Sequence, residues 1–469
     1  MSRQRHYQDL EKRAAKMIED EIRGVRDKYK EIDNFIIRDS RCISPSYTRG
    51  CPLVAERGEG VYVYDIIGKK FIDFNAGLAV LAAGHCHPEV IQAIQEQAHK
   101  LLHYSGTDFW YEPQVKLAEE LIKLVKERYG GEWKVYYGNS GAEAIEAAFK
   151  IVRWHTKRPY MLAFVPSFHG RTFGALSFTA SKTVHRRYFA PLVPGIIHIP
   201  WPYCYRCPYG HADEIEQTPG PYRDPKVCKF ECINYIRDYV FHSLVSPHEV
   251  GGIVFEPIAA EPGYIPAPKS FWKELKKLCD EEFWSSLRKD IEEEKKDKYM
   301  PSPAVKKMLE SYEEMLKEEQ LGILFVADEI QAGLGRTGKL FSCEHYDIVP
   351  DIICIAKAIA SGLPLGVTIA KSEKPNLMRW ISGAHASTFG GNPIACKVAC
   401  VMLKLLTKGG RGHGNREHKA LIENARDVGE FILGKIRGWK QKHPLIGDIR
   451  GVGFCLLYTS DAADDGESV

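Results

Sequence analysis

The middle of the chain alternates short apolar runs with longer amphipathic segments. Buried strands are predicted at 134–137, 160–165, 252–255, 322–327 and 351–355. The segment 142–155, between the first two runs, has helical periodicity, and helical segments separate several later runs. Such alternation is typical of a mostly parallel sheet that is covered by helices on both faces. A sheet of this kind binds its ligands at the carboxyl ends of its strands.

The first part of the chain has another pattern. Residues 1–35 predict a polar helix, and residues 61–74 alternate apolar and polar side chains around a central glycine, which predicts a hairpin. The small, Gly-rich stretch 75–90 predicts a loop. Helices are predicted at 88–102, where a proline opens the helix, and at 113–127.

Two segments interrupt the alternation. Residues 201–232 carry four cysteines and several prolines. Residues 281–320 hold 12 acidic and 8 basic side chains, and they lie where a helix-to-strand connection needs only about 2–6 residues. We therefore expect 281–320 to be an insertion of two exposed helices, split at Pro301 and Pro303, with a solvated surface.

Composition narrows the class of protein. The 469 residues are 44% hydrophobic and 27% charged, which argues against global disorder and suggests two or three domains. Sixty-four basic and 61 acidic side chains give a net charge of +3, so charge provides no case for a nucleic-acid or membrane-surface partner. The chain has no apolar run of about 18 residues and no secretory pattern at its start. Thirteen scattered cysteines favour reduced thiols and a cytoplasmic location.

Three strand ends carry candidate chemistry. Residues 137–143 leave a strand and open a helix with small side chains, so that backbone N–H groups can approach an anion. Asp328 directly follows an apolar strand, where a carboxylate can hold a protonated ring nitrogen. Lys357 follows another apolar run, and partial burial would lower its pKa and make its amine nucleophilic.

Each of these features has an ordinary structural explanation when taken alone. Residues 137–143 could be a simple helix cap, Asp328 an N-cap residue, and Lys357 a surface lysine with a buried stem. Taken together they supply a phosphate cradle, a carboxylate for a ring nitrogen and a lysine for covalent attachment. Pyridoxal 5′-phosphate needs all three. The 29 residues between Asp328 and Lys357 suffice for a helix and a return strand, so the two should end on nearby strands.

With these motifs the chain resembles the class III, or ω-, aminotransferases among the fold-type-I pyridoxal-phosphate enzymes, close to the 4-aminobutyrate and ornithine aminotransferases. The resemblance runs from about residue 40 to 454, apart from the insertion. It implies that Lys357 bonds to the cofactor and that Asp328 holds its ring nitrogen. It also implies further cofactor-binding residues: Ser140, Gly141 and Ala142 at the phosphate, Phe168 and Ile330 on the two ring faces, His169 beside Phe168, and Gln331 near the phenolic oxygen.

The fold implied by the resemblance is α/β, with a large domain around a mostly parallel seven-stranded sheet and a smaller α+β domain from both termini. We expect residues 1–75 to belong to the small domain, 76–385 to the large domain and 386–469 to the small domain again. Thr388 matches the threonine that reaches the phosphate of the other subunit, so the resemblance also implies a homodimer with shared active sites.

The implied reaction is a ping-pong transfer of an amino group from an ω-amino acid, of the 4-aminobutyrate or ornithine type, to a 2-oxo acid such as 2-oxoglutarate. Lys357 would move a proton between the substrate and the cofactor. Arg171 resembles the arginine that binds a substrate carboxylate, although a structural ion pair is the alternative. Glu261 resembles a glutamate that shields a second arginine, Leu78 a pocket-lining apolar residue, and Thr107-Asp108 a site for a distal amino group or else a surface turn.

Two other functions stay open. Relatives of this family include amino-acid racemases, which use the same lysine and cofactor, and the sequence does not separate them from transaminases. A silent binding protein on this fold is the third hypothesis, and the presence of both Lys357 and Asp328 argues against it.

The cysteines of segment 201–232 form the pattern C-x2-C-x20-C-x3-C, through Cys204, Cys207, Cys228 and Cys232. This spacing resembles a structural four-cysteine zinc site, and free thiols or a disulfide pair are the alternatives.

The end of the chain departs from the family pattern. The pattern holds through Phe454, whereas Cys455–Asp464 resembles the translation of a sequencing adapter. After Tyr458 the sequence is polar and does not predict a buried strand. We therefore expect the small domain to be truncated after about residue 454, without the second carboxylate-binding arginine and with poor solubility or weak activity.

Overall fold

The computed structural model describes residues 16, 24, 29–209, 228–296, 307, 310, 321–373, 376–443 and 445–460. The chain divides into two compact units, one formed by residues 1–76 with 84–87 and the other by residues 77–83 with 88–469. The expected division at residues 75 and 385 into large and small domains stays a prediction.

The first unit contains a helix at residues 29–42 and a three-stranded antiparallel sheet of β1 (Ala55–Glu59), β2 (Tyr62–Asp65) and β3 (Lys70–Ile72). The hairpin predicted at 61–74 is therefore confirmed as β2 and β3. Its turn depends on the buried Asp65, whose Oδ1 accepts the backbone N–H groups of Ile67 at 3.1 Å and Lys69 at 2.7 Å.

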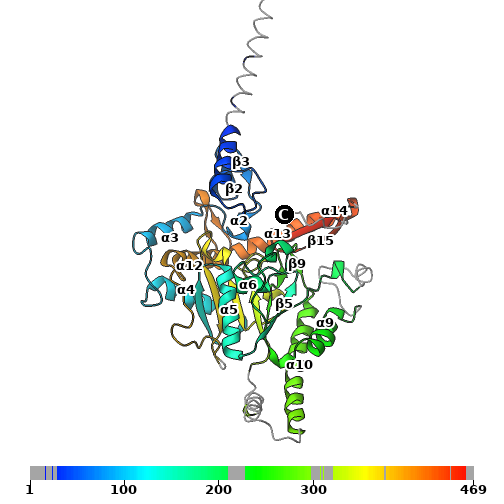
Figure 1. The fold of residues 1–469 in the computed structure, drawn as a ribbon. Coiled ribbons are helices and arrows are strands. Elements are labelled where there is room, and N and C mark those ends of the chain that lie inside the picture. Colours follow the sequence, from blue (N-terminus) through cyan, green and yellow to red (C-terminus); the bar gives the residue numbers. More distant parts are fainter. Residues whose placement is uncertain are drawn as a thin grey trace, which may run out of the picture. The chain divides into compact units, whose positions relative to one another are not determined.

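The second unit is built around a sheet that helices flank in Figure 1. This sheet has seven strands in the order β4-β12-β11-β10-β7-β5-β6. Only β12 runs antiparallel to its neighbours, so the expected mostly parallel α/β sheet is confirmed. All five predicted runs are strands of this sheet, while β6 and β12 were not predicted. The strands are β4 (Trp133–Gly138), β5 (Tyr160–Val165), β6 (Ile196–Pro200), β7 (Val250–Phe255), β10 (Leu324–Asp328), β11 (Ile352–Ile355) and β12 (Gly366–Lys371).

Helices cover both faces of this sheet because its strands are apolar on both sides. Helix α5 (Gly141–Thr156) packs its buried side chains against Val326 and Ile352 on one face. The neighbouring strand residues, such as Ile353, point to the other face, where they meet α4 (Glu112–Tyr129) and α12 (Pro393–Lys408). Helix α10 (Lys269–Lys296) packs on this second face beside Phe325. The result is a three-layer α/β/α core.

The remaining elements are short or peripheral. Helix α3 realises the helix predicted at 88–102 but ends at Ala98, and the predicted loop 75–90 contains the irregular turn α2. The short and peripheral elements are α2 (Ala76–Ala79), α3 (Pro88–Ala98), α6 (Phe173–Phe178), α7 (Thr183–Arg186), η1 (Cys204–Arg206), α9 (Glu231–Tyr235), η2 (Ile236–Phe241), η3 (Pro247–Glu249), β8 (Ile258–Ala259), β9 (Ile265–Pro266), η4 (Ser342–His345), η5 (Lys357–Ala360), β13 (Gly410–Arg411), η6 (His413–Asn415), β14 (Glu417–His418), α13 (Leu421–Arg437), α14 (Trp439–Lys442), β15 (Ile446–Val452) and β16 (Cys455–Ser460).

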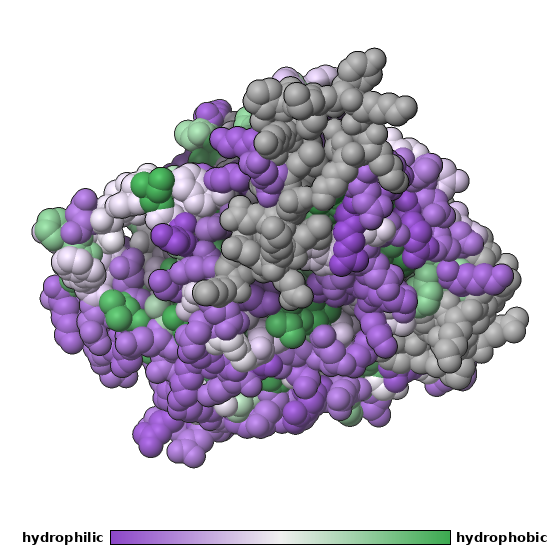
Figure 2. Space-filling view, turned by 90° about the horizontal axis from the view of Figure 1, so that it is seen from below, coloured by the Kyte–Doolittle hydropathy of each residue, from purple (hydrophilic) through white to green (hydrophobic). Residues whose placement is uncertain are grey.

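No helix in the described part of the chain is both long and apolar enough to cross a membrane. The face drawn in Figure 2 is mostly hydrophilic, and its hydrophobic residues lie in separate small spots. Scattered spots of this size are normal for a folded protein.

The end of the described chain forms an antiparallel hairpin. Strand β16 pairs with β15 along its length, from Val452 opposite Cys455 to Ile446 opposite Ser460. Residues 461–469 lie outside the described residues, so the expectation about a truncated small domain stays a prediction.

The expectation for residues 281–320 is partly wrong. No new helix starts at 281, because α10 continues without a break to Lys296. The surface of α10 is not fully solvated, because Phe283, Leu287 and Ile291 are buried in the main core. Their spacing of four residues puts them on one side of the helix, and the many charges around them concealed this apolar stripe. Most of 297–320 lies outside the described residues.

We predict that Phe283→Ala destabilises the protein by roughly 3–5 kcal/mol, because it removes a fully buried ring from α10. Chemical denaturation followed by circular dichroism measures this loss. Lys289→Ala, on the exposed side of the same helix, is the matched control and should change stability by less than about 0.5 kcal/mol. Equal, small effects of both substitutions would show that α10 is not part of the core.

Candidate active site

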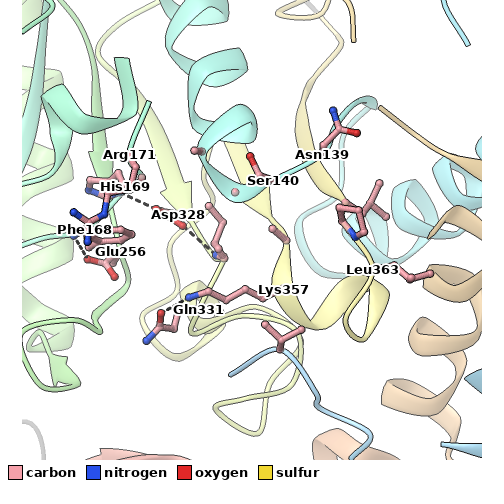
Figure 3. Close-up of a pocket in the computed structure, with 18 of the residues that line it drawn as sticks. Asn139, Ser140, Phe168, His169, Arg171, Glu256, Asp328, Gln331, Lys357 and Leu363 are labelled. Carbon is pink, nitrogen blue, oxygen red and sulfur yellow. Dashed lines mark hydrogen bonds and ion pairs between the residues drawn. The ribbon is translucent and has the colours of Figure 1, made fainter. Parts of the chain in front are cut away.

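A pocket of about 460 Å³ lies where several strands of the sheet end. The turn after β4 and the segments after β5, β7, β10 and β11 all contribute to its wall (Figure 3). Because β4, β7, β10 and β11 run in the same direction, their carboxyl ends meet at one edge. Ten of the predicted site residues line this pocket: Ser140, Gly141, Ala142, Phe168, His169, Arg171, Asp328, Ile330, Gln331 and Lys357.

The turn between β4 and α5 is a helix N-terminus that faces the pocket. The Ser140 hydroxyl accepts the N–H of Glu143 at 3.2 Å, and the Glu143 carboxylate accepts the N–H of Asn139 at 2.6 Å. Helix geometry leaves the first N–H groups, those of Gly141 and Ala142, without acceptors inside the helix. They are therefore available to an anion, which the helix dipole also favours.

Close packing supports this turn from behind. A Cβ on Gly141 would lie 2.9 Å from Ile330, so only glycine lets the two segments approach. A Cβ on Gly366, the first residue of β12, would lie 2.0 Å from the Ser140 backbone oxygen. The unpredicted strand β12 thus holds the turn in place through backbone contact.

Asp328 is the last residue of β10 and is almost fully buried. Its Oδ1 accepts the N–H of Ile330 at 3.0 Å, and its Oδ2 lies 2.7 Å from Nδ1 of His169. His169 is buried as well, and its Nε2 has no hydrogen-bond partner in the described part of the chain. Asp328 lines the pocket, and Figure 3 shows the two hydrogen bonds that orient its carboxylate there.

Within the motif that contains Asp328, Gln331 and Glu329 have different roles. Gln331 lines the pocket, whereas Glu329 turns away from it and is buried. The Glu329 carboxylate accepts the N–H groups of Ser342 and Cys343, each at 2.8 Å. Glu329 thus belongs to the structural support of this loop.

Lys357 directly follows the residue after β11 and points into the pocket. Its Nζ donates to Oε1 of Gln331, whose Nε2 donates to the Tyr264 hydroxyl at 3.3 Å. Burial lowers the pKa of Lys357, and the nearby Asp328 and Glu256 carboxylates oppose this shift only in part. Its backbone has φ of +48°, a strained value for a residue with a side chain, which is a frequent feature of functional sites. The prediction that Asp328 and Lys357 end nearby strands is confirmed, since β10 pairs with β11.

The segment after β5 contributes an aromatic ring and a cation. The Arg171 guanidinium carbon lies 5.3 Å from the centre of the Phe168 ring, and the edge of the His185 ring packs against Phe168 at 5.6 Å. Arg171 is exposed and lines the pocket. Burial lowers the pKa of His185, with a smaller contribution from the Arg171 charge.

Sequence reasoning missed Glu256, which is buried and lines the pocket beside Phe168. Its oxygens accept the N–H groups of Phe168 at 3.0 Å and Ala260 at 3.2 Å. The pattern that identified Asp328 was also present here, because Glu256 directly follows the apolar run 252–255. Glu256 opens the segment 256–261, in which the resemblance assigns a role only to Glu261.

Five predicted residues lie outside this pocket. Thr107, Asp108 and Thr388 are exposed, and Ser105 binds the Asp108 carboxylate at 2.6 Å in a local turn. Leu78 is 70% exposed. Glu261 forms an ion pair with Lys182 at 3.3 Å rather than with an arginine. Within the second unit, the predicted substrate-binding residues other than Arg171 do not line the cavity.

No disulfide bond joins the four predicted metal ligands, Cys204, Cys207, Cys228 and Cys232. Burial and the three neighbouring thiols raise the pKa of Cys232 to about 12, so the cysteines do gather. However, the described residues contain no group of three or more His, Cys, Asp or Glu side chains that could hold a metal ion. The structural zinc prediction therefore has no support.

Comparison with known proteins gives one consistent family. The family profile described as "Aminotransferase class-III" matches residues 43–283 and 303–467. The chain is 32% identical over 405 residues to the alanine/serine racemase of Pyrococcus horikoshii, covering 86% of this chain and 72% of the relative. It is 33% identical over 411 residues to the probable 4-aminobutyrate aminotransferase of Bacillus subtilis, covering 88% and 79%. The crystal structure of a Bacillus anthracis aminotransferase superimposes with a TM-score of 0.68 at 28% identity, covering 90% of this chain and 82% of that one.

We predict that Lys357 reacts with acetic anhydride at a lower pH than an ordinary lysine, because its pKa is lowered by burial. Mass spectrometry of the cofactor-free protein across a pH series measures the half-reaction point, to be compared with the usual lysine value of about 10.4. In Asp328→Asn this point should fall further, because the lost negative charge favoured the ammonium form. A half-reaction point that rises in this variant would contradict the assignment of the charges.

Proposed function

This chain belongs to the class III aminotransferase family, and we propose that it moves an amino group from an ω-amino acid to a 2-oxo acid such as 2-oxoglutarate, with pyridoxal 5′-phosphate as cofactor. One observation carries the proposal: Lys357, Asp328 and the Ser140–Ala142 turn all line one pocket of about 460 Å³. If these residues had unrelated structural roles, there would be no reason for them to line the same cavity.

The residues of the pocket fit pyridoxal phosphate. The open N–H groups at the start of α5 suit the phosphate, and the glycine at 141 lets Ile330 pack closely against this turn. Asp328 has its carboxylate at the pocket wall, where it would hold the ring nitrogen. Phe168 and Ile330 would contact the two ring faces, and Gln331 would lie near the phenolic oxygen. When bound, the cofactor binds amines covalently and accepts the negative charge that develops on the substrate carbon.

The chain's own residues would handle the proton. A lowered pKa keeps more of Lys357 in the neutral form, which can take a proton from substrate and return it. Gln331 orients the Lys357 amine by accepting its hydrogen bond, and Tyr264 in turn orients Gln331. Asp328, held by His169 and by the Ile330 N–H, would keep a positive charge on the ring nitrogen.

The donor would be of the 4-aminobutyrate or ornithine type. The name of the Bacillus subtilis relative supports 4-aminobutyrate. Arg171 would bind a carboxylate, since its planar fork is exposed at the pocket wall. Leu78, Glu261, Thr107 and Asp108 keep their proposed roles toward the substrate, although they do not line the cavity of this chain.

We also propose a homodimer with shared active sites and a cytoplasmic location. Exposed apolar side chains lie near Thr388: Phe389 is 61% exposed and Leu102 is 62% exposed, and Asn392 binds the Leu102 carbonyl at 3.0 Å. Trp110, at 91% exposure, belongs to the adjoining loop. Apolar groups of this size on one surface support association with a second copy, to which Thr388 would contribute. None of the thirteen cysteines forms a disulfide bond, which supports a reducing compartment.

A racemase is the second candidate, supported by the name of the Pyrococcus horikoshii relative. It would use the same lysine and cofactor. The two are separated by incubating the enzyme with an L-amino acid, with and without 2-oxoglutarate. A transaminase consumes the 2-oxo acid, whereas a racemase produces the D-amino acid without consuming it.

We predict that Lys357→Ala abolishes turnover and removes the yellow absorbance of the cofactor-loaded protein, because the amine that bonds to the cofactor is lost. Spectroscopy and a coupled assay with 4-aminobutyrate and 2-oxoglutarate measure both effects. Lys276→Ala, which removes an exposed lysine on α10, should leave both unchanged. Near-normal turnover by Lys357→Ala would overturn the proposed function.

We predict that Arg171→Lys raises KM for 4-aminobutyrate roughly ten- to hundredfold, because lysine cannot replace the two parallel hydrogen bonds to a carboxylate. The KM for a primary amine that lacks a carboxylate should change little. Steady-state kinetics with the two substrates provide the comparison. An equal rise for both would show that Arg171 acts on the cofactor or the fold.

A further inference from the structure

Glu256 follows the last residue of β7 and is 5% exposed. It joins two segments that are far apart in sequence, its own segment 256–260 and the segment of Phe168. One oxygen accepts the N–H of Phe168, in the segment after β5, at 3.0 Å, and the other accepts the N–H of Ala260 at 3.2 Å. Strands β5 and β7 are neighbours in the sheet, so Glu256 ties the two segments together directly beyond their carboxyl ends.

This carboxylate is an unfavourable group to bury. Burial raises the pKa of Glu256 to about 7, the nearby Asp328 charge adds to that rise, and His169 opposes it. A buried carboxylate is tolerated only where hydrogen bonds compensate the lost water. Here two backbone N–H groups provide the compensating hydrogen bonds. The free-energy cost of burying Glu256 therefore depends on the conformation of the Phe168 segment.

The Phe168 ring depends on its backbone for its position. The ring is only half-buried, and it contacts the exposed side chain of Arg171 and the edge of His185. Its backbone is held firmly by side chains: Glu256 accepts the N–H of Phe168, while Thr179 accepts those of His169 at 2.9 Å and Gly170 at 3.2 Å. Figure 3 shows Glu256 directly beside Phe168 on one side of the pocket.

We propose that Glu256 is a positioning residue, which fixes the Phe168 ring at the angle and depth needed to stack on the cofactor ring. The proposal rests on the proposed function, since it assigns Phe168 to the cofactor. Through Ala260 the same carboxylate also holds the turn that leads to Glu261. Glu256 itself binds backbone groups only, so it acts through Phe168.

The test compares Glu256→Gln with Glu344→Gln. Glutamine has one acceptor oxygen, so one of the two backbone N–H groups would face an amide donor. The Glu344 carboxylate also accepts a phenylalanine N–H, that of Phe341 at 2.8 Å, but it lies outside the pocket. The cofactor-free proteins are titrated with pyridoxal 5′-phosphate, and the affinity and the induced circular dichroism of the bound cofactor are recorded.

We expect Glu256→Gln to weaken cofactor binding about tenfold and to change the induced circular dichroism, which reports how the ring is held. Glu344→Gln should match the wild type in both. Wild-type affinity and an unchanged spectrum in Glu256→Gln would overturn the proposal. If Glu256→Gln does not fold, Glu256→Asp keeps the charge but is too short for both bonds, and it must then show the altered spectrum.

A double variant shows whether Glu256 acts through Phe168. In a Phe168→Leu background the stacked ring is absent, so adding Glu256→Gln should weaken binding by less than about twofold. A second tenfold loss in that background would contradict the proposal, because it would indicate a direct effect on the pocket. Failure of the wild type to bind pyridoxal phosphate would be a different result, which overturns the proposed function itself.

Discussion

Three neighbouring parallel strands, β7, β10 and β11, end at one edge of the sheet, and Glu256, Asp328 and Lys357 stand at or just beyond their ends. Backbone hydrogen bonds fix the spacing of such strands, so these side chains have nearly fixed positions before any ligand binds. The rest of the pocket depends on this register. The turn at Ser140 reaches the same edge because β4 runs parallel to β11, with the antiparallel β12 between them.

This arrangement gathers charge in a place from which water is largely removed. Two carboxylates, Glu256 and Asp328, lie close enough to Lys357 to affect its pKa, and His169 binds Asp328. Burial disfavours every ion, whereas opposite charges favour one another. Lys357 is thus left with an amine that loses its proton more readily than an exposed lysine does, while Asp328 remains anchored by two hydrogen bonds.

Helix α10, outside the sheet, is held to the core by a narrow apolar stripe. Helix α10 is rich in charged residues, yet it buries Phe283, Leu287 and Ile291 against the core. A stripe of one apolar residue per helical turn is enough to anchor a helix whose other faces are solvated. The high charge of α10 therefore does not show whether the helix packs against the core. Its position on the sheet decides this.

The sequence by itself determined the strand pattern and the chemistry of the site. Five apolar runs, a small-residue turn, Asp328 and Lys357 sufficed to predict a parallel sheet and a pyridoxal-phosphate pocket, because these are local features of the chain. Strand β12 was not predicted, and Glu256 was overlooked although it too follows an apolar strand. Only the tertiary structure decided that Glu256 faces Phe168, 88 residues away, and that Gly366 supports the turn at Ser140. Such contacts depend on which strands become neighbours, and strand order is a property of the packed sheet rather than of any local segment.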